Sequence, residues 1–307
     1  MKEYLSISPE IMDALENNDP VVALESNLIT YVVPYPNNIE FAKKYNQLIR
    51  DNGAIPAITA IFDGKLKVGL SDDELEQIAI PEKTPKASRR DIPQLIANKQ
   101  PGATTVASTI IIAEMAGIKI FCTGGIGGVH RNATETFDIS ADLHEMARTD
   151  VAVISAGTKS ILDIGLTLEY LETLGIPVIG MRTNQFPAFF CRDSKFGVDY
   201  RCETEAEVAK ILKAKWDMGI NGGVVIGNPI PDEASLNYEE MEILIERAIK
   251  DANKNGIKGK DVTFYLLGKI KEFTHGRSFT ATKDLLNNNA VISSKIALEL
   301  SKLYKMA

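Results

Sequence analysis

The sequence predicts an α/β protein built on a mixed, mostly parallel sheet. Short apolar runs alternate with longer segments of helical periodicity from about residue 20 to residue 230, as in strands joined by crossover helices. Most of the short runs are apolar throughout, as parallel strands covered on both faces are. After Asp232 the apolar spacing of three and four indicates a helical C-terminal region. Because there is no linker or internal repeat, we expect a single domain over residues 1–307.

Seven strands are predicted from the apolar runs. They cover residues 21–24, 58–62, 65–68, 118–122, 151–155, 178–181 and 224–226. Asp63-Gly64 separates two of these runs, and this dipeptide favours a tight hairpin because both turn positions need a positive φ. The hairpin makes one strand pair antiparallel, so the sheet should be mixed.

Helix ends are marked by capping residues. Ser71 and Glu74 form a capping box, in which the serine oxygen and the glutamate carboxylate each satisfy a free amide at the helix start. Each of four further predicted helices is followed by a glycine suited to a left-handed C-cap. These helices cover residues 38–52, 104–115, 163–174 and 204–218, and a last helix is expected over residues 289–304.

The composition limits the classes of function. With 34 basic and 41 acidic residues the net charge is −7, and no face concentrates the basic residues, which argues against nucleic-acid binding. Three scattered cysteines indicate a reducing compartment. The N-terminal residues lack the apolar core of a signal peptide, and no apolar run is long enough to cross a bilayer. We therefore expect a cytoplasmic protein that binds a small molecule, with neither a nucleic acid polymer nor a membrane as partner.

Lys159 is the strongest candidate for a catalytic residue. It follows the predicted strand at 151–155 and is surrounded by glycine and small residues. An amine at the carboxyl end of a strand is placed to act as a nucleophile, provided that burial or a neighbouring cation favours its neutral form. The alternative is a lysine that extends along the sheet edge into solvent. The preceding segment contains a glycine-rich loop at 124–128 and the polar candidates His130, Arg131, Asp138 and Asp142.

Three segments have the composition of anion-binding sites. The glycines at 124–128 let backbone amides approach a phosphate, although they lack the third glycine of a dinucleotide fingerprint and also suit a tight turn. Lys86 opens a cationic loop at 86–91, which is either a phosphate site on an acidic protein or solvated surface. Thr105 and Val106 stand at a predicted helix start, where amides and hydroxyls bind an anion or simply cap the helix.

Carboxyl and amide side chains supply the remaining candidates. Glu25 ends the first predicted strand and is placed to act as a general acid, unless it only pairs with a lysine. Asp138 and Asp142 are four residues apart and would share one face of a helix, where oxygen ligands suit Mg²⁺ or Mn²⁺. The alternative is a helix capped by Asp138, with Asp142 exposed to solvent. Asn289 can hydrogen-bond a ligand, but helix capping explains it equally well.

Eight sequence blocks lie in order along nearly the whole chain. They are A-L-E-S at 23–26, P-Y-P-x-N at 34–38, K-A-S-R-R-D at 86–91, G-A-T-T-V at 102–106, T-G-G-I-G-G-V-H-R at 123–131, T-F-D-I-S-A-D-L at 136–143, S-A-G-T-K-S-I-L-D-I-G-L-T-L-E-Y-L-E-T at 155–173 and N-P-I-P at 228–231. Together they closely resemble the pseudouridine-5′-phosphate glycosidase family. The resemblance implies a three-layer α/β/α fold, a homotrimer and a divalent cation, usually Mn²⁺. It also implies reversible cleavage of the carbon–carbon glycosidic bond of pseudouridine 5′-phosphate, which gives uracil and ribose 5-phosphate through a lysine Schiff base.

The same resemblance implies a role for each matching residue. Lys159 would be the nucleophile, Glu25 the proton donor and Asp138 the metal ligand. The substrate would be contacted by Lys86, Val106, Ser140, Ala141 and Asp142, with His130 and Arg131 beside its phosphate. A carbon–carbon bond to uracil has no leaving oxygen that an acid could protonate, so ordinary hydrolysis by two carboxylates would not suffice.

The chain departs from the family close to the proton donor. It has Asn27 where threonine is usual, and Tyr31-Val32-Val33 where His-Gly-Met is usual. These differences bear on recognition of the base. The leading hypothesis is therefore a C-glycosidase acting on pseudouridine 5′-phosphate. Its rivals are another Schiff-base lyase acting on a sugar phosphate or nucleotide, and a phosphometabolite-binding protein without catalysis.

Overall fold

An eleven-stranded sheet forms the centre of the computed structural model, which describes residues 3–257 and 262–306. Its strands are β1 (Leu5–Ile7), β2 (Val21–Glu25), β3 (Ile55–Phe62), β4 (Lys65–Val68), β5 (Lys86–Ala87), β6 (Gly102–Thr104), β7 (Ile120–Cys122), β9 (Ala152–Ser155), β11 (Val178–Met181), β12 (Tyr200–Cys202) and β13 (Val224–Gly227). The main order is β1-β4-β3-β2-β7-β9-β13-β11-β12, and β6 pairs with β3 and with β5. Two short strands, β8 (Val129–His130) and β10 (Leu162–Asp163), form a separate antiparallel pair.

The sheet is mixed and mostly parallel, as the sequence predicts. Among the strands described in this sheet, two pairings are antiparallel, those of β3 with β4 and with β6. The β3–β4 turn is the expected hairpin, in which Asp63 and Gly64 have φ values of 50° and 72°. Because every other pairing is parallel, the carboxyl ends of β2, β7 and β9 meet at one edge.

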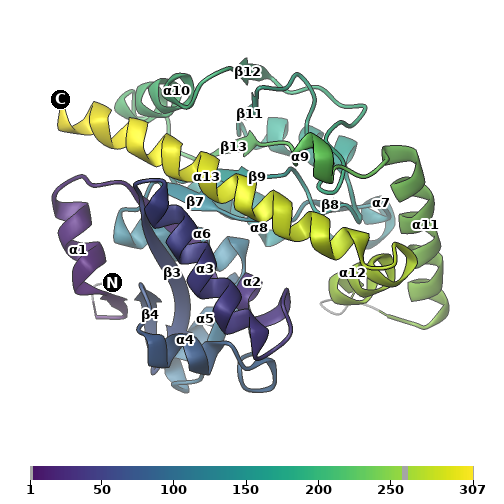
Figure 1. Ribbon diagram of the computed structural model, residues 1–307, viewed down its shortest axis with the longest axis horizontal. Helices are drawn as coiled ribbons and strands as arrows, with labels where there is room; N and C mark the ends of the chain where they lie inside the picture. The colour runs from purple at the N-terminus through teal and green to yellow at the C-terminus, as the bar shows by residue number, and fades with distance from the viewer. Residues whose placement is uncertain (1–2, 258–261, 307) are drawn as a thin grey trace.

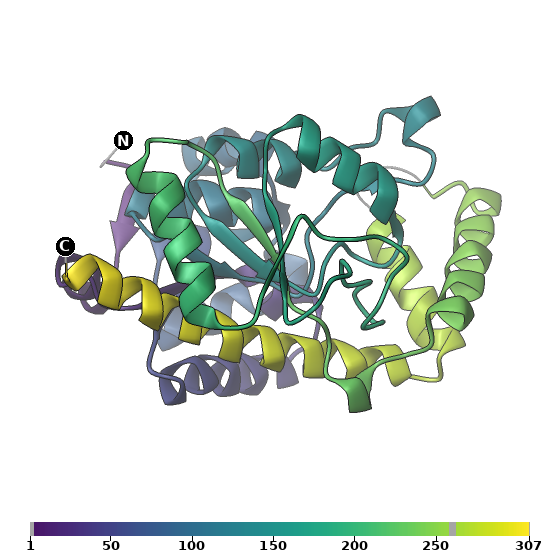
Figure 2. The ribbon, with the colours of Figure 1, turned by 90° about the horizontal axis from the view of Figure 1, so that it is seen from above.

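Helices cover both faces of the sheet, which gives three layers (Figures 1 and 2). The helices are α1 (Pro9–Glu16), α2 (Ser26–Tyr31), α3 (Asn37–Asp51), α4 (Asp72–Ile78), α5 (Ile92–Ala97), α6 (Val106–Ala116), α7 (Ala133–Thr136), α8 (Ala141–Arg148), α9 (Ile164–Thr173), α10 (Glu205–Asp217), α11 (Tyr238–Lys254), α12 (Val262–Phe273) and α13 (Arg277–Lys305). The long helix α13 packs with α3 on one face, and α6 packs with α8 on the other. In both views α11 and α12 lie at the end of the molecule opposite the two termini.

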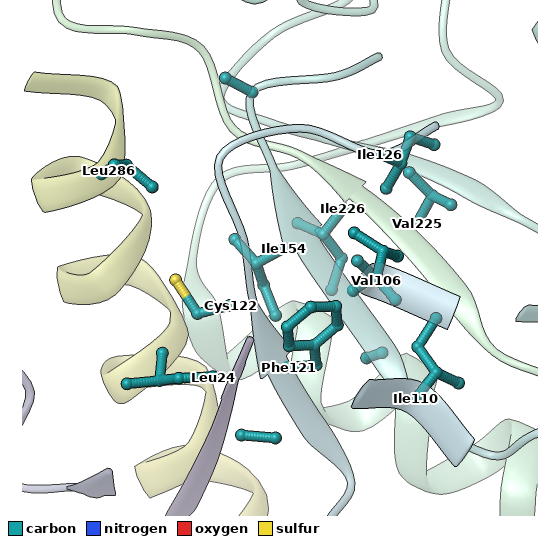
Figure 3. Close-up of a cluster of buried hydrophobic side chains, with 14 of the residues drawn as sticks. Leu24, Val106, Ile110, Phe121, Cys122, Ile126, Ile154, Val225, Ile226 and Leu286 are labelled. Atoms are coloured by element: carbon teal, nitrogen blue, oxygen red, sulfur yellow. The ribbon is translucent and has the colours of Figure 1, made fainter. Parts of the chain in front are cut away.

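Alternation along the central strands divides the core between the two faces. Phe121 and Cys122 are neighbours in β7, and both are completely buried. Cys122 lies on the α13 side near Leu286, whereas Phe121 lies on the side of Ile110 in α6 (Figure 3). Successive side chains of a strand point to opposite faces, so an apolar strand such as β7 can join two cores.

Most predicted boundaries are confirmed to within two residues. The capping box at Ser71 is present, and the glycines that follow the four predicted helices all have positive φ. Two predictions were wrong because β-pairing was missed. The segment at 102–104 is strand β6 and not the start of a helix, and the 86–91 loop contains strand β5 and a short 3₁₀ helix at Arg89–Asp91.

The last helix is longer than predicted. It begins at Arg277 and not at residue 289, so the asparagines at 287–289 lie in its interior. From the sequence these asparagines could cap the start of a helix. In the structure the side chains of Asn288 and Asn289 instead donate to the carbonyl oxygens of Pro229 and Thr123, in loops that follow strands of the sheet. Across the described residues, none of the helices combines the length and apolar character needed to cross a membrane.

Candidate active site

A cavity of about 300 Å³ lies at the carboxyl ends of β2, β7 and β9. It is lined by Glu25 at the end of β2, by Thr123 directly after β7, and by Lys159 four residues after β9. Lys86 of β5 lines it as well. The carboxyl edge of a parallel sheet is the usual position of a ligand site in α/β proteins. Three residues that the sequence analysis singled out separately, Glu25, Lys86 and Lys159, are therefore brought together.

The backbone around Lys159 is held by the glycine-rich loop. The amide of Lys159 donates to the carbonyl oxygen of Ile126 over 3.0 Å, and the amide of Ile126 donates to the carbonyl oxygen of Gly157 over 3.0 Å. Gly157 has φ of 85°, and a Cβ at this position would overlap the carbonyl oxygen of Pro187. Only glycine fits there. The loop thus fixes a half-buried lysine at the cavity wall.

Glu25 is the buried acid of the cavity. It is 2% exposed, and its carboxylate accepts a hydrogen bond from the hydroxyl of Thr123. Burial raises the pKa of Glu25, while the positive charge of Lys159 and the Thr123 hydrogen bond act in the opposite direction. Removing a carboxyl from water favours its neutral form. Glu25 is therefore suited to donate a proton.

Lys86 adds a second cation to the cavity. Burial lowers its pKa, as does repulsion from Lys159, while Asp142 and Glu25 raise it. The neighbouring Arg89 pairs with Glu145 of α8, whose side chain is buried. This ion pair joins the 86–91 segment to α8, so the cationic run is partly structural.

The rest of the cavity wall is largely apolar. Helix α2 and the residues directly after it, the loop after β11, helix α12 and the first half of α13 contribute these residues: Leu28, Tyr31, Val32, Pro34, Phe189, Phe190, Leu267, Phe279 and Leu286. Lys271 of α12 also lines the cavity, with its amine 4.5 Å from the ring centroid of Phe279. Apolar walls with a few polar groups are typical of small-molecule sites.

The N-termini of α6 and α8 are joined by Asp142. Its carboxylate accepts from the amide of Ala107 over 2.9 Å and from the amide of Gly127 over 2.8 Å. Asp142 is 6% exposed, so the alternative that placed it in solvent is wrong. The predicted helix shared with Asp138 is also wrong, because α8 begins at Ala141.

Several residues expected to contact the substrate surround this junction. Thr105 is the N-cap residue of α6, its amide donates to the hydroxyl oxygen of Ser108 over 2.8 Å, and Val106 is the first residue of that helix. Ser140 caps α8, with its hydroxyl accepting from the amide of Asp142, and Ala141 is the first residue of the helix. None of these residues lines the cavity, but the charge of Asp142 acts on both Glu25 and Lys86. The junction is therefore adjacent to the cavity and separate from its apolar wall.

His130, Arg131 and Asp138 form a neighbouring polar group outside the cavity lining. His130 Nε2 is 3.7 Å from Asp138 Oδ2, and burial lowers the pKa of His130 against the effect of that carboxylate. Arg131 donates two hydrogen bonds to the carboxylate of Glu242 in α11, from Nη1 over 2.9 Å and from Nη2 over 2.8 Å. Arg131 is thus committed to α11 and is not directed at the cavity.

Asp138 offers a divalent cation a single carboxylate. Its side chain is 47% exposed, and the described residues contain no group of three or more His, Cys, Asp or Glu side chains that could hold a metal ion. An ion that keeps most of its water, as Mg²⁺ and similar hard cations do, needs only one or two protein carboxylates. Asp138 fits such a water-rich ion and does not fit one that requires a complete protein shell.

Thr123 was not singled out by the sequence analysis. It binds Glu25 through its hydroxyl, and its carbonyl oxygen accepts from Asn289 Nδ2 over 2.8 Å. Asn289 in turn accepts from Asn228 over 2.8 Å, so its buried amide supports the cavity from behind and caps no helix. A polar residue directly after an apolar strand was the available signal for Thr123. Phe189 and Phe190 lie in an irregular loop with no comparable signal.

The fold and the cavity together define an α/β protein with a lysine and a buried acid at the carboxyl edge of a parallel sheet. The family model described as indigoidine synthase A like protein matches residues 10–299. The chain is 56% identical over 306 residues to a pseudouridine-5′-phosphate glycosidase of Clostridium botulinum, covering 99% of this chain and 100% of that protein. It is 56% identical over 298 residues to one of Petrotoga mobilis, covering 97% of each. The chain belongs to this pseudouridine-5′-phosphate glycosidase family.

Solved structures show the same fold. A prealnumycin C-glycosynthase crystallised in complex with ribulose 5-phosphate has a TM-score of 0.93 at 39% identity, covering 99% of both chains. An indigoidine synthase A-like protein of Thermotoga maritima has a TM-score of 0.87 at 36% identity, covering 97% of both. The three-layer α/β architecture is therefore that of the family.

Proposed function

We propose that this protein is a C-glycosidase that reversibly converts pseudouridine 5′-phosphate to uracil and ribose 5-phosphate. The observation that carries the proposal is the placement of Lys159 and the buried Glu25 in one largely apolar cavity. The full-length similarity to pseudouridine-5′-phosphate glycosidases supports the choice of substrate. The neighbour crystallised with ribulose 5-phosphate supports a five-carbon sugar phosphate as ligand.

Lys159 would break the bond in three steps. Its neutral amine attacks the anomeric carbon, the bond from that carbon to the ring oxygen breaks, and the oxygen takes up a proton. The nitrogen lone pair then expels the base as the carbon–carbon bond breaks, which leaves an iminium on the sugar and places the bond electrons and a proton on the uracil carbon. Water hydrolyses the iminium to ribose 5-phosphate and returns the amine.

Glu25 is the proposed source of the proton that the uracil carbon receives. Its burial raises its pKa, so it remains protonated at a higher pH than an exposed glutamate. The hydroxyl of Thr123 fixes the carboxyl beside the cavity. The ring oxygen takes the proton that the attacking amine loses, and hydrolysis of the iminium releases the proton that reloads Glu25, so each turnover leaves the acid unchanged.

The two helix N-termini are the proposed phosphate site. The helices begin at Val106 and Ala141, directly after their N-cap residues Thr105 and Ser140, and free amides at a helix start attract anions. The charges of Lys159 and of Asp142, which lies at this junction, both act on Lys86. Lys86 would contact the sugar phosphate. His130 would act beside the phosphate, and so would Arg131, whose ion pair with Glu242 would have to open first. Asp142 would act by holding the two N-termini together, and Asn289 by supporting Thr123.

Asp138 is the proposed ligand of a divalent cation, Mn²⁺ by family resemblance. When bound, such an ion screens negative charge and orients water. We expect Asp138→Ala to reduce the rate and to remove any stimulation by added Mn²⁺. Metal-dependence is measured as the rate of uracil release after chelation and readdition of Mn²⁺. Full activity in chelator would contradict this role.

The decisive experiment is trapping with borohydride. With ribose 5-phosphate, reduction should fix a five-carbon adduct on the peptide that contains Lys159, detected by mass spectrometry. Lys159→Ala should give no adduct and no uracil release at unchanged melting temperature, while Lys210→Ala, an exposed lysine of α10, should behave as the wild type. A binding protein would give no adduct, and a different Schiff-base lyase would give an adduct but no uracil from pseudouridine 5′-phosphate.

The homotrimer stays a prediction from the family resemblance. Light scattering on the purified chain should give three times its mass of 33.6 kDa. A monomer at micromolar concentration would contradict it.

A further inference from the structure

Helix α2 presents one face to the cavity. Asn27, Leu28 and Tyr31 of this helix line the cavity, together with Val32, which directly follows it. Residues spaced by three or four positions lie on the same face of a helix. Leu28 and Val32 are apolar, and the hydroxyl of Tyr31 donates to the carbonyl oxygen of Thr84 over 2.7 Å. Asn27 therefore supplies the amide group of this wall.

The carboxamide of Asn27 has an incomplete set of hydrogen bonds. Its Oδ1 atom is buried and has no hydrogen-bond partner. Among the described residues that line the cavity, Asn27 has the only carboxamide. Buried polar atoms in folded proteins are nearly always bonded, and an unbonded one at a ligand cavity is a place where a ligand can complete the set.

We infer that Asn27 determines base specificity by hydrogen-bonding the nucleobase through its carboxamide. The inference rests on the proposed function. A carboxamide carries a donor and an acceptor side by side, and the imide edge of uracil alternates carbonyl oxygens with N–H groups, so the two can pair at two points. Asn27 is two residues after Glu25, so a base held by this amide lies beside the acid that would protonate its carbon.

Base analogues with a blocked edge test the inference. In the synthetic direction with ribose 5-phosphate, kcat/KM is measured for uracil, 1-methyluracil and 3-methyluracil. The wild type should reject at least one methylated base, and Asn27→Ala should lower kcat/KM for uracil by about tenfold or more while losing that preference. An equal loss for all three bases, or no loss for any, would overturn the inference.

Asn46 of α3 provides a matched control. Its Oδ1 is likewise buried without a partner, but it lines a different cavity, next to Ser71 and Glu74. Asn46→Ala should leave the base preference of the wild type intact. If Asn27→Ala melts at a much lower temperature, Asn27→Ser, which loses the amide with a smaller change in polarity, is compared instead.

Uracil binding separates this inference from the proposed function. Calorimetry with uracil in the presence of ribose 5-phosphate needs no turnover, and Asn27→Ala should weaken binding of uracil but not of the rejected methylated base. Absence of uracil release from pseudouridine 5′-phosphate by the wild type would refute the reaction alone. Uracil binding that is unchanged by Asn27→Ala would refute the role of Asn27 alone.

Discussion

An acid and an amine, the carboxyl of Glu25 and the side chain of Lys159, share one cavity. Burial has the largest effect on the carboxyl and raises the pKa of Glu25 despite the nearby cation. The benefit for the proposed reaction is an acid that stays protonated. The cost falls on folding, because the folded state must hold a buried negative charge once the pH exceeds that raised pKa.

Replacing Glu25 by glutamine should change both activity and the pH dependence of stability. Activity should fall by about 10²- to 10⁴-fold, as expected for loss of a general acid. Below the ordinary pKa of 4.5 the carboxyl is protonated in the folded and unfolded states alike. As the pH rises above 4.5, the unfolded carboxyl ionises first, and the wild type loses stability until the pH passes the raised folded pKa.

The melting temperatures of wild type and Glu25→Gln, measured across this window, give the direct comparison. The difference between variant and wild type should grow in favour of the variant as the pH rises from 4.5. Parallel curves would show that burial has not raised the pKa of Glu25. Full activity in the variant would exclude it as the proton donor.

At the scale of the elements, the loop between β9 and β10 depends on one glycine. Gly157 has φ of 85° and no room for a Cβ beside Pro187, and its carbonyl oxygen accepts from the glycine-rich loop. Gly117, the C-cap of α6, has nearly the same φ of 87°, but a Cβ at this position would have no atom within 4 Å. Comparing alanine substitutions at Gly157 and Gly117 therefore separates the cost of the left-handed backbone from the cost of steric overlap.

Alanine at these two positions should have unequal effects. Gly117→Ala should cost about 1 kcal/mol of unfolding free energy, since only the left-handed conformation is penalised. Gly157→Ala should cost clearly more and should reduce trapping of ribose 5-phosphate at Lys159, because the overlap must displace the loop that carries the amine. Denaturant unfolding and the borohydride assay measure the two effects. Equal costs in stability with normal trapping would contradict the role of Gly157.

Sequence patterns predicted the central elements because their signals are local. The apolar runs of β2, β7 and β9, the Asp63-Gly64 turn and the helix-ending glycines each specify structure over a few residues. The strands β5 and β6 were missed because they are two and three residues long and exist only through pairing with each other and with β3. Their pairing depends on contacts between distant segments, which local periodicity does not carry.

The candidate site was predicted in part for the same reason. Glu25 and Lys159 stand directly at or after recognisable strands, so their meeting at the carboxyl edge follows from a parallel sheet. The position of Asp142 did not follow, because its burial results from bonds to Ala107 and Gly127 in two other segments. The family resemblance marks Asp142 as a substrate contact, but only the structure shows that it binds the amides of Ala107 and Gly127.

In the whole molecule, the cavity lies between the sheet edge and the C-terminal helices. Phe189 and Phe190 follow β11, whereas Leu267 and Phe279 come from α12 and α13. Helix α12 lies at the end of the molecule away from α1 and the chain termini (Figure 1). A ligand in the cavity therefore touches elements that are far apart in sequence, and its binding should stabilise them together.

Hydrogen exchange should reveal this coupling between the sheet and α12. A ligand that binds only the closed, folded cavity lowers the population of open forms in proportion to its saturation, so 100-fold excess over Kd slows exchange by up to about 100-fold. With ribose 5-phosphate and uracil, peptides from α12 and from residues 186–190 should exchange at least about tenfold more slowly than in the free protein. Peptides from α1 should not change, because α1 contributes nothing to the cavity lining. Equal slowing in α1 and α12 would indicate general stabilisation of the domain, and no slowing in α12 would place the ligand outside this cavity.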